Sequence, residues 1–299
     1  MQTPDITPLV TLMKERHSIY LKRQRGLPKP WTDDKILQTY SFCNTYRELD
    51  RVTIWVRENI REPFADHPAL WFALCMARQI NWPDTLAELL ADKKGATPMH
   101  GKRFDPDRMR SIMLARQARG EKLYTGAYMI NAQFGKREEY AGRDKAFFTS
   151  HIVLAPLWAT RDYVEGHLRE LPTIEDTTNL LSTYHGWGGF MSYEVATDMR
   201  WTRYLNQAAD ICTWANPGPG AKRGLNRLYG RDTRAHLNRD KAIEEMREVY
   251  ALVKKQWPRP SKDWPAIEMR EIEHSLCECD KYLRVQSGEG RPRAKYQGV

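Results

Sequence analysis

Residues 180–199 read LLSTYHGWGGFMSYEVATDM, which is an apolar helix end, a glycine-rich turn and then a second helical pattern. Glycine adopts positive φ without a steric penalty, so this composition permits a tight turn between two helices. The turn consists of four consecutive residues: Gly186, Trp187, Gly188 and Gly189. The pattern is typical of a helix-hairpin-helix, which we place at about residues 174–201.

A turn of this kind leaves backbone N–H groups free at the N-terminus of its second helix. Such groups can hold a DNA phosphate without reading the base sequence. Ser192 and Val195 fall where the motif requires a small and an aliphatic residue against the first helix. An ordinary corner between two helices, with glycine at the C-cap, has the same local features. We favour the DNA-binding form.

The hydrophobic pattern elsewhere is mostly helical. Apolar residues recur three and four positions apart, for example at Leu70, Leu74 and Ala77. Strand-like alternation is scarce, and residues 122–134 are compatible with either an extended strand or a helix. The spacing predicts helices near residues 50–61, 67–80, 83–91, 106–119, 143–169, 174–184, 190–201, 236–256 and 265–284. We therefore predict an all-α, compact fold.

Chain length and composition narrow the class of protein. The 299 residues can bury a sizeable core, and we expect a single helical domain over residues 1–285 followed by a basic, flexible tail over 286–299. The mean hydropathy is −0.68 and no run of about 18 apolar residues occurs, so no spanning helix is expected. The N-terminus does not resemble a secretory signal. Five cysteines indicate reduced thiols in a cytosol, and a net charge of +9 permits a polyanionic partner.

Two further clusters carry cations. In the glycine- and proline-rich loop of residues 214–224, Lys222 and Arg223 stand where a helix begins. They form either an anion clamp or a solvated basic turn. In residues 42–56, helical spacing places three polar side chains on one face: Asn44, Arg47 and Arg51. Asp50 could orient Arg47, which lies three residues before it. The alternative is a helix surface stitched by weak ion pairs.

Other patterns exclude two kinds of site. The segment GATPMHGKR at 95–103 is not a phosphate-binding loop, because its glycines are wrongly spaced and Arg103 replaces the magnesium-binding Ser or Thr. An intrinsic phosphate-loop kinase is therefore not expected. Cys277 and Cys279 are two positions apart on a helix, where their thiols point to different faces, and the histidines show no ligand spacing. The sequence predicts no metal site.

Five motifs occur here in an order that resembles a known family. They are Pro30-Trp31-Thr32-x-Asp34, Phe42-x-Asn44-x-x-Arg47-Glu48-x-Asp50-Arg51, the hairpin GWGGFMSYEVATDM, the loop PGPGAKRGL and the late helix Glu273-His274-x-Leu276-Cys277-Glu278-x-Asp280-Lys281-Tyr282-x-Arg284. Along most of its length the sequence resembles the bacteriophage α-glutamyl/putrescinyl thymine pyrophosphorylases, which are related to the helical domain of 5-hydroxymethyluracil DNA kinases. Cys279 departs from the pattern, which has an aromatic residue there.

The resemblance implies a fold similar to helix-hairpin-helix DNA glycosylases and chemistry on thymine-like bases in DNA. The enzyme would displace phosphate or pyrophosphate from 5-(pyro)phosphoryloxymethyluracil with an amine or amino acid, in the cytoplasm of an infected bacterium. Its partners would be double-stranded DNA and a small amine or amino acid, with no membrane. No cofactor is implied beyond Mg²⁺ accompanying the pyrophosphate. The base would be flipped or reached in an exposed strand.

The same chemistry assigns roles to individual residues. The departing oxygens require preorganised cations, for which the candidates are Arg47, Arg51, Lys222 and Arg223. The incoming ammonium requires a base; Asp210 lies 22 residues after Gly188, where the glycosylases are similar in placing a catalytic Asp, and Asp198 is the second choice. Three further roles are weaker: addition of the Cys277 thiol to the ring, DNA contact by Trp187, and pocket lining by Trp31 or Tyr46.

Two other functions fit the same sequence. A helix-hairpin-helix glycosylase would use the same fold and Asp210 to excise a modified base, leaving an abasic site. A non-catalytic DNA-binding module would keep its function after loss of Asp210 and Arg47.

Overall fold

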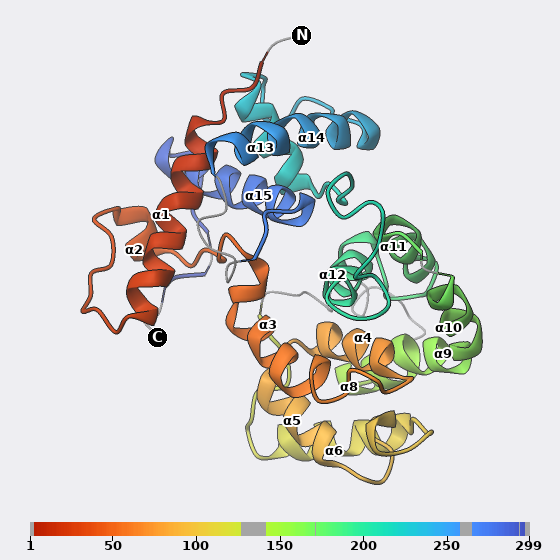
Figure 1. The fold of residues 1–299 in the computed structure, drawn as a ribbon. Helices are drawn as coiled ribbons and strands as arrows, with labels where there is room; N and C mark the ends of the chain where they lie inside the picture. The colour runs from red at the N-terminus through yellow and green to blue at the C-terminus, as the bar shows by residue number, and fades with distance from the viewer. Residues whose placement is uncertain (1–2, 127–141, 171, 258–264, 293, 297–299) are drawn as a thin grey trace. The chain divides into compact units, whose positions relative to one another are not determined.

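The computed structural model describes residues 3–126, 142–170, 172–257, 265–292 and 294–296 (Figure 1). Within these ranges the regular structure is helical, and the β pairing is limited to one isolated bridge between Tyr40 and Lys295. The prediction of an all-α fold is confirmed. Residues 127–134, which the sequence left open between strand and helix, lie outside the described ranges.

The chain packs as two compact units, a division that the expected single domain over 1–285 did not include. Unit 1 combines both ends of the chain, Met1–Asp50 and Asp210–Val299, and unit 2 is the continuous segment Arg51–Ala209. None of the described helices is long and apolar enough to cross a membrane.

Unit 1 is assembled around its last helix. Its described helices are α1 (Thr7–Gln24), α2 (Lys35–Thr39), the short 3₁₀ helix η1 (Arg47–Leu49), α13 (Pro219–Leu228), α14 (Arg239–Gln256) and α15 (Met269–Gln286). Helix α15 contacts α13, α14, α1 and α2, and Figure 1 shows it beside α13 and α14. Residues on its inner face, such as Ile272 and Leu276, are fully buried.

The closest helix contact in unit 1 depends on two glycines of α13. A Cβ at Gly220 would lie 2.3 Å from the Cys277 sulfur, and one at Gly224 would lie 2.4 Å from the Leu276 carbonyl oxygen. No side chain fits at such separations, so these glycines let the backbones of α13 and α15 approach. The predicted loop of residues 214–224 is therefore wrong in its second half, because α13 begins at Pro219.

Unit 2 is a longer series of helices: α3 (Arg51–Val56), the π-helix η2 (Arg57–Arg61), α4 (Leu70–Ile80), α5 (Pro83–Ala91), η3 (Pro98–His100), α6 (Pro106–Ala118), α8 (Lys145–Phe147), η5 (Phe148–Leu154), α9 (Ala155–Ala159), α10 (Arg161–Arg169), α11 (Ile174–Ser182) and α12 (Gly189–Met199). Every residue of α4 is buried, so α4 is the core of the unit. Helix α12 packs against α4 and against α11.

Two residues of the predicted flexible tail form backbone hydrogen bonds with the segment after α1. The Ser41 N–H donates to the Ala294 carbonyl at 3.2 Å, and the Tyr296 N–H donates to the Thr39 carbonyl at 2.9 Å. These backbone bonds fix residues 294–296 against the end of α2.

We predict that Gly224→Ala destabilises unit 1 by about 1–3 kcal/mol, because the added methyl group meets the rigid Leu276 backbone. Gly166→Ala is the matched control: Gly166 lies in α10, a Cβ at this position would meet nothing within 4 Å, and alanine there should add about 0.5–1 kcal/mol of stability. Urea unfolding followed by circular dichroism measures both. Equal unfolding midpoints for Gly224→Ala and the native chain would contradict this packing.

Candidate functional site

Helix α15 is where the separate sequence motifs of unit 1 meet. Distant segments reach it through polar bonds: Tyr282 Oη donates to Asp34 at 2.5 Å, the Cys43 N–H donates to Glu278 at 3.0 Å, and the Gly218 N–H donates to Glu273 at 3.2 Å. Asp280, which is 1% exposed, accepts from Arg223 at 2.8 Å and Arg227 at 3.0 Å. Segments that are far apart in sequence therefore bond to the same helix, α15.

The segment of residues 42–50 is held by the Asp50 carboxylate. Asp50 accepts from the Asn44 N–H at 2.9 Å and from Arg47 Nη1 at 2.9 Å, so the predicted orientation of Arg47 by Asp50 is confirmed. The Asn44 amide also donates to the Leu49 carbonyl at 2.6 Å. These local bonds compete with helical ones.

The expected helix face of Asn44, Arg47 and Arg51 is therefore wrong. Arg47 begins the short helix η1, whereas Arg51 begins α3 and belongs to unit 2. Within unit 1 the cation of this cluster is Arg47, whose side chain is 12% exposed.

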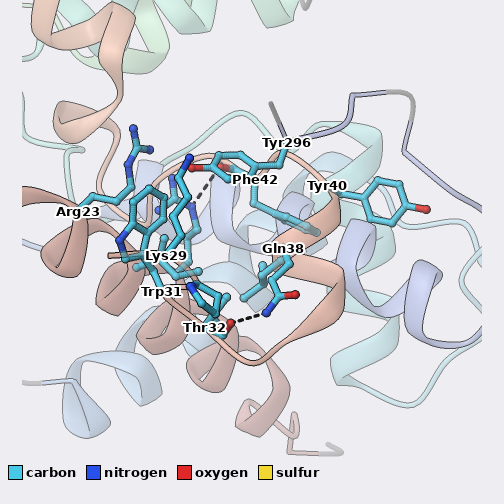
Figure 2. Close-up of a pocket in the computed structure, with 12 residues that line it drawn as sticks. Arg23, Lys29, Trp31, Thr32, Gln38, Tyr40, Phe42 and Tyr296 are labelled. Carbon is cyan, nitrogen blue, oxygen red and sulfur yellow. Dashed lines mark hydrogen bonds between the residues drawn. The ribbon is translucent and has the colours of Figure 1, made fainter. Parts of the chain in front are cut away.

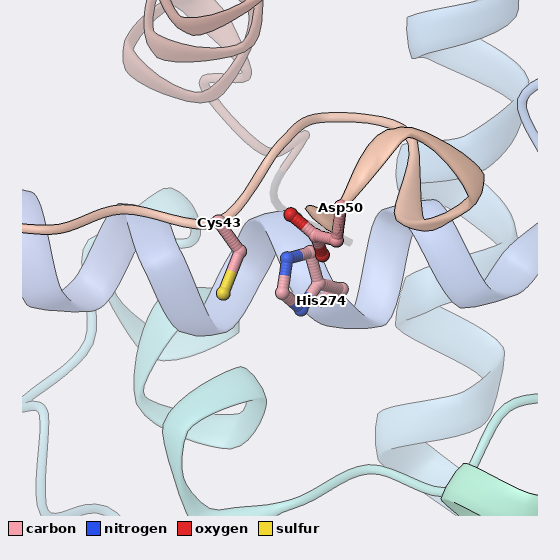
Figure 3. A group of neighbouring side chains, drawn as sticks. All are labelled: Cys43, Asp50 and His274. Atoms are coloured by element: carbon pink, nitrogen blue, oxygen red, sulfur yellow. The ribbon is translucent and has the colours of Figure 1, made fainter. Parts of the chain in front are cut away.

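Three possible metal ligands lie together beside Arg47. One donor atom each of Cys43, Asp50 and His274 lies within 4.8 Å of the others (Figure 3). A sulfur, a nitrogen and an oxygen donor are a set that Zn²⁺ accepts, with one open position. The Arg47 guanidinium on Asp50 counts against a resident cation, and burial raises the pKa of the Cys43 thiol well above its usual range. Sequence spacing gave no sign of this group.

A buried charged layer lies under the Arg47 backbone. Arg270 is paired with Glu48 at 3.6 Å and with Glu271 at 3.3 Å, and all three side chains are nearly inaccessible. The Glu271 carboxylate accepts the Arg47 N–H, and burial raises the pKa of Glu271 to about 7. A carboxyl group that titrates near neutrality is suited to hold or release a proton. Sequence reasoning missed Glu271, because its burial arises only in the folded chain.

Asp210, the predicted base, is half-buried. Its carbonyl accepts from the N–H groups of Thr213 and Trp214, each at 2.9 Å, in a tight turn. The next residue, Ile211, accepts from the Met269 N–H at 3.2 Å. Asp210 therefore lies near the first turn of α15, the end of that helix at which Glu271 meets Arg47.

Asp198 does not fit the role of a second base. It is fully buried in unit 2, where Arg78 Nε and Nη2 donate to its two oxygens at 2.5 and 2.6 Å. Arg78 also donates to Thr53 at 3.2 Å and to Asn81 at 3.4 Å. A buried carboxylate with a two-fold guanidinium partner joins α12 to α4 and does not reach a substrate.

The glycine-rich turn joins α11 to α12 as predicted, with positive φ at Gly186. A Cβ at Gly186 would lie 2.5 Å from a Val153 methyl group, whereas Gly188 has φ −64° and open space around it. The predicted contact of Trp187 with DNA is wrong: its side chain is fully buried and its Nε1 donates to the Val153 carbonyl at 3.3 Å. Gly188, Gly189 and the aromatic Phe190 are exposed, and DNA binding by this turn remains a prediction.

The predicted anion clamp at Lys222 and Arg223 lies within α13. Arg223 is paired with buried Asp280, and the Gly218 N–H at the helix start already donates to the Glu273 carboxylate. Lys222 is half-buried one turn into the helix. Carboxylates of α15 therefore already bond Arg223 and the Gly218 N–H, where the predicted clamp requires an open site for an anion.

Cys277 does not fit the role of a nucleophile. Burial raises the pKa of its thiol to about 12, so the thiolate population at neutral pH is negligible. Its sulfur packs against Gly220 of α13. Of the two aromatic residues expected in a pocket, Trp31 lines one, whereas Tyr46 is 1% exposed and packs against His17.

Two comparisons with known proteins relate the chain to 5-hmdU DNA kinases. Residues 4–291 match the family described as "5-hmdU DNA kinase, helical domain". The chain is similar to a "5-hmdU DNA kinase" of Bacillus phage SP10, with 24% identity over 300 residues that cover 92% of this chain and 44% of the relative. The chain thus spans less than half the length of this curated relative. No solved structure matches.

We predict that Asp198→Asn destabilises unit 2 by about 3–5 kcal/mol, because it leaves the buried Arg78 guanidinium without its counter-charge. The matched control is Asp162→Asn in α10, whose carboxylate is 90% exposed and 3.8 Å from Arg161. Thermal and urea unfolding report the difference. Native stability for Asp198→Asn would remove the structural role assigned to the pair.

We also predict that Gly188→Val weakens binding to duplex DNA while the chain stays folded, because nothing lies within 4 Å of the added Cβ. Binding by the native chain should fall steeply with salt and depend little on base sequence. Gly166→Ala serves again as the control and should bind as the native chain does. Fluorescence anisotropy at several salt concentrations measures this; native affinity for Gly188→Val would remove the turn from the DNA interface.

Proposed function

The chain belongs to the family of 5-hmdU DNA kinase helical domains, and on that premise we propose that it modifies thymine-derived bases in phage DNA. The proposed reaction displaces phosphate or pyrophosphate from 5-(pyro)phosphoryloxymethyluracil with an amine or an amino acid. The observation that carries the proposal is the family match over residues 4–291.

The proposed step breaks one bond and forms another at the exocyclic methylene carbon. The C–O bond to the phosphate breaks, and the leaving group takes the electron pair. The amine nitrogen forms the C–N bond and gives up one proton to a base. Negative charge therefore grows on the leaving oxygens, and a proton must be accepted on the other side of the carbon.

Two residues near the start of α15 suit these demands. Arg47 supplies a cation whose orientation is fixed in advance by its bond to Asp50. A preorganised charge stabilises a developing anion without reorganising during the reaction. Asp210, a half-buried residue near the same end of the helix, supplies a carboxylate for the proton.

The proposed DNA contact is the exposed part of the α11–α12 turn. Gly188 and Gly189 are exposed at the start of α12, and the N-terminus of a helix attracts phosphate groups. The net charge of +9 supports a polyanionic partner. The location that follows from this function is the cytoplasm of the infected host.

We predict that Asp210→Asn lowers the single-turnover rate by roughly a hundredfold or more, in line with general-base contributions, and leaves DNA affinity unchanged. The substrate is duplex DNA carrying the pyrophosphorylated base, offered putrescine, glutamate, glycine or serine in turn. Release of pyrophosphate and the mass of the digested nucleosides are the readouts. Arg47→Gln should likewise lose rate more than affinity.

The matched control is Asp240→Asn, an exposed carboxylate in the first turn of α14 of the same unit. It should react at the native rate. A heavier nucleoside identifies the transferase, whereas abasic sites would identify a glycosylase. DNA binding without either product, with each amine supplied, would leave a binding module and overturn the proposal.

A further inference from the structure

Unit 1 contains a pocket that is lined by Trp31 and by residues to which the preceding sections assign no role in the reaction. Its volume is about 440 Å³, within the range of roughly 300–1,000 Å³ of small-molecule sites. It lies between α1, the segment after it and the tail, and Figure 2 shows its lining side chains. We call it the basic pocket and define it by Arg16, Arg23, Lys29, Trp31, Phe42 and Tyr296.

The basic pocket has a one-sided charge. Three of its described lining residues are cations and none is a carboxylate. The Arg23 guanidinium carbon and Lys29 Nζ lie 5.3 and 5.2 Å from the centre of the Trp31 ring, so Trp31 holds both cations beside the cavity (Figure 2). A cavity of this kind favours an anion.

Two polar atoms in the pocket wall lack protein partners. Arg16 Nη1 and Tyr296 Oη are buried, and neither has a hydrogen-bond partner among the described residues. The Arg16 Nε donates to the Phe42 carbonyl at 3.1 Å, which fixes the guanidinium plane. Because these two donors belong to residues that line a cavity of ligand size, they are placed to satisfy a bound molecule that accepts hydrogen bonds.

Much of the remaining wall is apolar or aromatic. Phe42 and Tyr296 offer ring surface, and Pro30, Ile19 and Leu37 add apolar surface. The other lining residues are Thr32, Gln38 and Tyr40. A free phosphate would leave this surface without a partner. A ligand with a planar ring and an attached phosphate satisfies both the cations and the apolar wall.

We propose that the basic pocket binds the phosphorylated base of the substrate, a uracil ring whose 5-methylene group carries phosphate. The phosphate oxygens pair with Arg16, Lys29 and the Tyr296 hydroxyl, and the ring lies against Phe42. This assignment rests on the proposed function. Arg16 and Phe42 also border a small cavity lined by Cys43 and His274, so the pocket adjoins the metal-ligand group of Figure 3.

The test measures the equilibrium binding of a free nucleoside to the full chain by calorimetry. The probe is 5-(phosphoryloxymethyl)-2′-deoxyuridine, compared with 5-(hydroxymethyl)-2′-deoxyuridine and with inorganic phosphate. We expect the phosphorylated nucleoside to bind at least tenfold more tightly than either. Lys29→Gln should weaken its binding about tenfold, and Tyr296→Phe, which removes only the hydroxyl group, should weaken it several-fold.

The matched control is Lys14→Gln, an exposed residue of α1 outside the pocket, which should bind the probe as the native chain does. Equal affinity for both nucleosides, phosphate binding as tightly as the probe, or native binding by both Lys29→Gln and Tyr296→Phe would overturn the assignment. Because binding is measured without turnover, tight probe binding with no transfer activity would refute the proposed function alone. Transfer activity with no probe binding would refute the pocket alone.

Discussion

The approach of α13 to α15 is the constraint on which unit 1 depends. With a carbonyl oxygen of α15 only 2.4 Å from where a Cβ of Gly224 would stand, the two helices touch backbone to backbone. This contact places Arg223 and Arg227 on Asp280 and Gly218 on Glu273. It also leaves the other sides of α15 for α1, α2 and the segment that carries Arg47. The candidate site is thus organised by α15, whose packing against α13 depends on two glycines, Gly220 and Gly224.

Both units contain a buried carboxylate that is paired with arginine. Arg78 and Asp198 are 2% and 0% exposed, and Asp280 is matched by two arginines. Such pairs add little net stability compared with apolar packing, but removing one partner is costly. We infer that they set which helices pair with which. Arg16 Nη1 and Tyr296 Oη differ from these paired charges. Both atoms are buried without a partner among the described residues, and both residues line a cavity of ligand-sized volume.

Some of the candidate site was predictable because it depends on local spacing. Asp50 stands three residues after Arg47, and the predicted pairing of the two is confirmed at 2.9 Å. The positive φ at Gly186 follows from the same kind of local reasoning. Glu271 and the Cys43–Asp50–His274 group were not predictable, since burial and proximity across the chain create them. Helical spacing did not predict the separation of Arg47 from Arg51. The Asp50 carboxylate bonds the Asn44 N–H, and the chain leaves the helical conformation at Asp50, between the two arginines.

The sequence by itself determined an all-α chain, most helix positions and the tight turn around Gly186, because helical periodicity and glycine conformation act over a few residues. Tertiary structure decided what the same residues do. The glycines of PGPGAKRGL pack a helix against α15 instead of freeing a loop, because α15 lies on them. Asp198 is an ion-pair partner instead of a base, because Arg78, 120 positions away, reaches it in the core. Trp187 is core instead of surface, and its Nε1 donates to the carbonyl of Val153, 34 positions away. Each of these outcomes depends on a neighbour that is distant in sequence, and no local pattern contains that information.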